Sequence, residues 1–119
     1  MPGSVGMLFM AAAVAAVASQ QTADKAELVP KIAAEMQKCW SLPAGIDGSV
    51  VVTARFAPDG SLDGSPTAEG DAAAPAAKAL AQSAVRAVIR CQPYAVLPQS
   101  GVPYEVWREM KITFDANDM

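Results

Sequence analysis

Residues 48–61 read GSVVVTARFAPDGS, and this stretch indicates a β-strand that ends in a tight turn. β-Branched residues fill its first half, and apolar and more polar positions alternate along it, as they do in a strand with one buried face. Val50, Val52, Ala54 and Phe56 share one face, whereas Val51, Thr53 and Arg55 share the other. Pro58 presets its own φ and Gly60 accepts a positive φ, so we expect a hairpin turn and a weaker second strand near 62–69.

A helical pattern precedes this hairpin. Apolar residues recur there at spacings of three and four, and they are Val29, Ile32, Ala33, Met36, Cys39 and Trp40. Proline is tolerated in the first turn of a helix, so Pro30 predicts that the helix starts near residue 28. Pro43 and Gly45 predict its end.

A second helical pattern follows the hairpin. Pro75 fits the first turn, and Pro93 ends the run. The apolar stripe consists of Ala76, Leu80, Ala84, Ala87, Val88 and Cys91. Because most of these side chains are small, we expect the helix to lie close against a sheet.

The last segment, residues 105–115, reads as a strand with one buried face. Val106, Met110, Ile112 and Phe114 share one face, and Trp107, Glu109, Lys111 and Thr113 share the other. The order helix, strand, strand, helix, strand predicts a two-layer α+β domain. We expect a three-stranded antiparallel or mixed sheet in the order 2-1-3, with both helices on one face. The third strand is then an edge, whose unpaired N–H and C=O groups can accept a guest strand.

The N-terminal residues resemble an export signal. Residues 5–18 carry no charge and would span about 21 Å as a helix, which is short for a membrane anchor. Ala16-Val17-Ala18 fits a cleavage site, so we expect a signal peptide over 1–18, a flexible lead-in over 19–27 and the domain over 28–119. The alternatives are an uncleaved inner-membrane anchor and an alanine-rich helix buried in the domain.

Composition narrows the functional classes. The chain has no histidine, a net charge of −3 and no basic run, which argues against metalloenzymes, hydrolases and nucleic-acid binders. We therefore expect no catalytic residue, metal, cofactor or small-molecule substrate. The two cysteines, Cys39 and Cys91, favour a disulfide in an exported chain over two buried free thiols.

An ordered set of short motifs resembles the C-terminal periplasmic domain of TolA, which belongs to the TolA/TonB C-terminal domain superfamily. The set comprises Lys38-Cys39-Trp40, Pro43 to Gly45, Val50 to Phe56 followed by Pro58-Asp59-Gly60-Ser61, Ser83-Ala84-Val85-Arg86-Ala87-Val88, Cys91-Gln92-Pro93-Tyr94, Leu97-Pro98, Tyr104 with Trp107, and Ile112-Thr113-Phe114-Asp115. It covers about residues 28–119. The resemblance implies the TolA fold, a Cys39–Cys91 disulfide and a non-enzymatic periplasmic module of the Tol–Pal system, which supports envelope integrity and cell division.

The same resemblance implies partners of the TolB or Pal type, and also colicins or phage coat proteins. A TonB-like energy-transducer domain that contacts outer-membrane transporters is the alternative. Only about ten residues, or at most about 35 Å of extended chain, separate the apolar segment from the domain. We therefore expect a module that binds partners without transmitting force from the TolQ–TolR motor.

The last strand is the candidate binding edge. Its residues are Glu105, Val106, Trp107, Arg108, Glu109, Met110, Lys111, Ile112 and Thr113. We expect the ring of Trp107 to be exposed beside the guest strand. The alternative is that Trp107 covers a helix and that the loop 92–103 blocks the edge.

Overall fold

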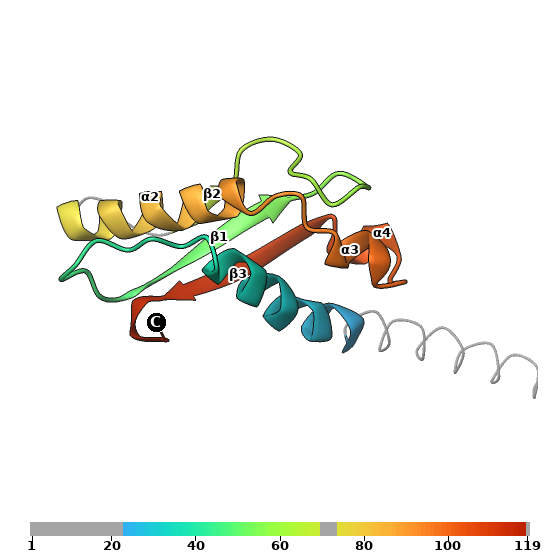
Figure 1. Ribbon diagram of the computed structural model, residues 1–119, viewed down its shortest axis with the longest axis horizontal. Helices are drawn as coiled ribbons and strands as arrows, with labels where there is room; N and C mark the ends of the chain where they lie inside the picture. The colour runs from blue at the N-terminus through green and yellow to red at the C-terminus, as the bar shows by residue number, and fades with distance from the viewer. Residues whose placement is uncertain (1–22, 70–73, 119) are drawn as a thin grey trace, which may run out of the picture.

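The computed structural model describes residues 23–69 and 74–118 (Figure 1). Residues 23–37 are helical and are called helix 23–37 below. The remaining elements are β1 (Ser49–Arg55), β2 (Thr67–Glu69), α2 (Pro75–Arg90), α3 (Val96–Gln99), α4 (Tyr104–Trp107), β3 (Glu109–Asp115) and the 3₁₀ turn η1 (Ala116–Asp118). The expected signal peptide, residues 1–18, lies outside the described residues.

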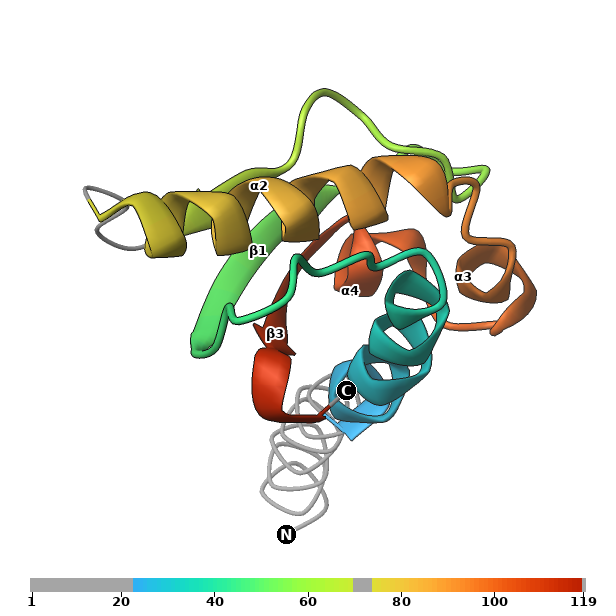
Figure 2. The ribbon, with the colours of Figure 1, turned by 60° about the vertical axis from the view of Figure 1, so that its left-hand side comes forward.

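The sheet has the order β2-β1-β3, and both strand pairs are antiparallel, as the order of elements predicted. Alternate side chains of β1 and β3 are buried, so one face of the sheet forms the floor of the core. Helix 23–37 contributes Leu28, Ile32 and Met36 to that core, and α2 contributes a small-residue face that includes Ala84 and Ala87. Figure 2 shows the two helices crossing the same side of the sheet.

The hairpin is shorter than the sequence pattern indicated. Only Thr67–Glu69 form the second strand, and a single bridge between Phe56 and Leu62 marks its expected beginning. Gly64 takes a φ of +83°, and Pro66 has no N–H to donate. These two residues turn the chain away from β1 before it returns at Thr67.

Helix 23–37 includes residues before the expected start near residue 28. Pro30 therefore lies inside the helix and not in its first turn. Residues 23–27, expected as a flexible lead-in, are also helical. Pro30 is exposed, whereas Leu28 and Ile32 on either side of it are 2% and 0% exposed. A proline inside a helix costs one backbone hydrogen bond. Burial of the two flanking apolar side chains offsets this loss.

The end of helix 23–37 is tied to α2 in two ways. A disulfide joins Cys39 to Cys91, with their Cα atoms 5.8 Å apart. One residue further on, the indole Nε1 of Trp40 donates a hydrogen bond to Ser83 Oγ at 2.9 Å. Ser83 Oγ in turn donates to the carbonyl oxygen of Leu80 at 2.7 Å. The buried indole N–H of Trp40 therefore depends on the Ser83 hydroxyl for its hydrogen-bond acceptor.

The turn after β1 docks on the segment after α2. Tyr94 N donates to the carbonyl oxygen of Gly60 at 2.8 Å, and the Tyr94 hydroxyl donates to the carbonyl oxygen of Val88 at 2.6 Å. The Tyr94 ring meets Phe56 edge to face, with centroids 5.6 Å apart. Burial raises the pKa of Tyr94, so the hydroxyl stays protonated as a donor at all ordinary pH values.

This docking leaves no room for a side chain at Gly60. A Cβ there would lie 2.9 Å from the carbonyl carbon of Tyr94 and closer still to its oxygen. Gly60→Ala should therefore lower the free energy of unfolding by about 2–4 kcal/mol, measured by urea denaturation. Gly64→Ala is the matched control, because Gly64 also has a positive φ but no atom within 4 Å of its Cβ position. A loss no larger than that of the control would contradict the close approach.

Removing the hydroxyl of Ser83 should leave the Trp40 indole buried without an acceptor. We expect Ser83→Ala to cost about 1–3 kcal/mol of unfolding free energy, and much less when Trp40→Phe is already present. Chemical denaturation of the four proteins of this double-mutant cycle gives the coupling. Equal costs in the two backgrounds would show that the indole does not depend on Ser83.

Candidate functional site

The candidate site is the free edge of β3. Phe56 N donates to Arg108 O at 2.8 Å, and Ala116 N donates to Gly48 O at 2.9 Å, so these bonds flank the β1–β3 ladder at its two ends. The register between the strands is continuous from one bond to the other. In an antiparallel pair the bonded positions alternate. The even-numbered residues of β3 therefore bond to β1, and the odd-numbered residues direct their N–H and C=O groups away from it.

Four residues of β3 thus present outward backbone groups, namely Glu109, Lys111, Thr113 and Asp115. Within the part of the chain that the structure describes, no strand pairs with this side of β3. The other edge, β2, is only three residues long, and the same alternation leaves Ala68 alone facing outward. β3 is therefore the longer template for a guest strand.

The predicted strand over 105–115 is wrong in its first part. Glu105, Val106 and Trp107 belong to the short helix α4, and Arg108 follows it as the C-cap. The alternation of apolar residues did not distinguish a strand from a helix at residues 104–107. Val106 fits the strand pattern, whereas Tyr104 and Trp107 are spaced as on one helical turn. Their rings meet edge to face at 4.9 Å, which favours the helix.

The prediction that Trp107 is exposed is also wrong. Its side chain is buried in the core with 2% exposure, and its Nε1 donates to the carbonyl oxygen of Val102 at 3.0 Å. The Tyr104 hydroxyl donates to the carbonyl oxygen of Phe56 at 2.6 Å. Met110 and Ile112, also predicted at the site, are buried in the core as well. These residues position β3, and the odd-numbered residues Glu109, Lys111 and Thr113 are the exposed ones.

Ion pairs cover the open face of the sheet beside this edge. Lys111 Nζ lies 2.9 Å from Glu69 Oε1, which connects β3 to β2 across β1. Hydrogen bonds from Lys111 and Thr53 lower the pKa of Glu69, and Glu69 raises the pKa of Lys111. Arg55 Nε lies 3.8 Å from Glu109 Oε1. The charges of Lys111 and Glu109 are therefore engaged within the sheet, while their backbone groups face outward.

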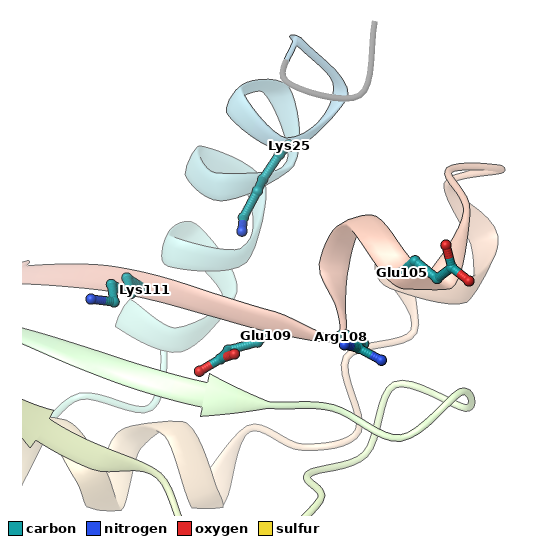
Figure 3. Close-up of a pocket in the computed structure, with 5 residues that line it drawn as sticks. All are labelled: Lys25, Glu105, Arg108, Glu109 and Lys111. Carbon is teal, nitrogen blue, oxygen red and sulfur yellow. The ribbon is translucent and has the colours of Figure 1, made fainter. Parts of the chain in front are cut away.

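A groove of about 420 Å³ lies where β3 begins. It is lined by Lys25, Glu105, Arg108, Glu109 and Lys111. Figures 1 and 3 show helix 23–37 running beside β3 on the side away from β1. In Figure 3, Lys25 points from the helix toward the strand. Lys25 lies in a stretch that was expected to be a flexible lead-in, so the sequence pattern did not indicate its place at the groove.

Among residues 23–69 and 74–118, no three His, Cys, Asp or Glu side chains gather as a metal ion would require. None of the helices in these ranges is long and apolar enough to cross a membrane.

Comparison with known proteins gives a fold and a family. A solved structure, TolAIII bound to a peptide derived from the N-terminus of TolB, is similar with a TM-score of 0.60 and 22% identity. The similarity covers 74% of this chain and 71% of that one, and it establishes a TolA C-terminal-like fold. No curated protein matches this sequence. The model of the family described as uncharacterised conserved protein UCP034077 matches residues 22–116, so this chain belongs to that family.

Proposed function

We propose that this protein is a non-enzymatic binding module that takes up an extended segment of a partner protein as an additional strand beside β3. The observation that carries the proposal is the free edge with outward backbone groups at Glu109, Lys111, Thr113 and Asp115. A guest strand gains main-chain hydrogen bonds at such an edge, and alternate side chains determine its selectivity.

The partner that we propose is an N-terminal segment of the TolB type. TolAIII, which shares the fold, was solved with a peptide from the N-terminus of TolB. The Cys39–Cys91 disulfide supports an oxidising compartment such as the periplasm, and so does the uncharged run over residues 5–18. Together these features support a role in a Tol–Pal-type envelope system.

The direct test is an NMR titration of the ¹⁵N-labelled domain with a peptide from the N-terminus of a TolB protein. We expect the amide signals of Glu109, Lys111, Thr113 and Asp115 to shift most, because their N–H groups would bond to the guest. A peptide from the transporter segment that TonB contacts is the comparison for the alternative energy-transducer role. Stronger binding of that peptide would favour the TonB-like function.

A pair of substitutions at Thr113 separates backbone from side-chain recognition. Thr113→Pro removes the outward N–H and should weaken peptide binding at least tenfold, whereas Thr113→Ala keeps the N–H and should bind within about threefold of wild type. Circular dichroism and the dispersion of the amide spectrum report whether each variant is folded, and Lys111→Pro supplies a second site for the same test. Wild-type affinity in a folded proline variant at both positions would place the guest strand elsewhere.

A further inference from the structure

We infer that the β3 edge prefers an extended segment that carries a carboxylate next to the start of β3, where Lys25 and Arg108 flank the groove. This inference rests on the proposed function and adds the chemistry of the partner. It is drawn from the groove described above, which lies between helix 23–37 and the first residues of β3 (Figure 3).

Five charged side chains line the groove, and the cationic ones are left in excess. Two of its five lining side chains are engaged elsewhere, since Glu109 pairs with Arg55 and Lys111 pairs with Glu69. Among the residues that the structure describes, Lys25 and Arg108 form no ion pair. The fifth side chain, Glu105, lies on α4, and Figure 3 shows its carboxylate pointing away from Lys25. Two cationic groups therefore remain available to a guest at this end of the strand.

The groove lies at the point where the outward-facing edge of β3 begins. Arg108 is the residue immediately before β3, and Glu109 is the first residue with an outward N–H group. A guest residue paired with Glu109 lies at the entrance of the groove that Lys25 lines from the helix. The side chain of that guest residue shares the open face of the sheet with Glu109, whereas the side chain of the next guest residue points toward the helices. A carboxylate on this next residue therefore meets the positive groups of Lys25 and Arg108 and avoids the carboxylate of Glu109. Attraction between the guest carboxylate and these cations favours binding, and more so at low salt.

Helix 23–37 also indicates what the rest of the guest looks like. Val29 and Ala33 follow Lys25 at intervals of four residues and so lie along the same side of the helix. Both are partly buried against the core. Guest side chains that point toward the helix pass along this apolar row, whereas those on the other face meet the charged open side of the sheet. The preferred segment therefore alternates apolar and polar residues and has its acidic residue at one end.

The test uses capped eight-residue peptides of alternating valine and threonine. Three peptides carry aspartate, asparagine or lysine at the first position, and three carry the same residues at the last position, so that both strand directions are sampled. Titrations of the ¹⁵N-labelled protein at 20 mM and 500 mM NaCl give the dissociation constants. At low salt, in the better of the two directions, we expect aspartate to bind about fivefold more tightly than asparagine, and lysine to bind most weakly. The advantage of aspartate should shrink at high salt.

Protein variants show whether the two named cations are responsible. The double variant Lys25→Gln with Arg108→Gln should abolish the preference for aspartate over asparagine. Lys31→Gln is the matched control, because Lys31 lies on the other side of the same helix and pairs with Glu27. It should keep the full preference. Lys25→Glu should invert the order, so that the lysine peptide binds more tightly than the aspartate peptide.

The outcomes distinguish this inference from the proposed function. If all peptides shift the β3 amides with equal affinity, the edge binds strands and the preference for a carboxylate is wrong. If neither these peptides nor the TolB peptide shift the β3 amides, the proposed function itself is wrong. If the preference survives in the double variant but disappears in Lys31→Gln, a different cation recognises the carboxylate.

Discussion

The whole architecture depends on the sheet having a single apolar face. Val50, Val52 and Ala54 of β1 alternate with exposed or half-buried residues, and β3 repeats the pattern with Met110, Ile112 and Phe114. Because burial of apolar surface is the main favourable term in folding, every apolar helix face has to stack on that one side. The other face then remains polar, and no strand of the described chain pairs with the outer edge of β3, beside which helix 23–37 runs. The free edge is thus a consequence of where the core lies.

Three aromatic residues hold the layer of helices in register with the sheet. Trp40, Tyr94 and Trp107 each bury an apolar ring and bond their single polar group to a defined acceptor, which is Ser83 Oγ, Val88 O and Val102 O respectively. An aromatic ring supplies a large buried area, and the hydrogen bond fixes its orientation. The three junctions lie at the end of helix 23–37, at the segment after α2 and at α4 before β3. Each fixes a connection that would otherwise be a loop over the core.

The sequence predicts much of this fold, since the period of β1 and the apolar stripe of α2 are strong local signals. The order β2-β1-β3 follows from them through the rules for connecting strands and helices. What it does not predict depends on tertiary contacts. The helix before Pro30 persists because Leu28 is buried, and α4 forms because Trp107 reaches into the core. Lys25 carries no local signal for its place at the groove, which arises only when helix 23–37 lies beside β3.

An exposed edge strand must also avoid pairing with a second copy of itself, and the charges of β3 address this problem. In the antiparallel register that overlaps two copies fully, centred on Ile112, Glu109 of one copy lies opposite Asp115 of the other at both ends. Like charges directly opposite one another destabilise a strand pair. A guest segment of different sequence avoids this repulsion while it uses the same four outward backbone positions. The acidic ends of β3 therefore disfavour self-association without removing any of the hydrogen-bonding groups that a partner needs.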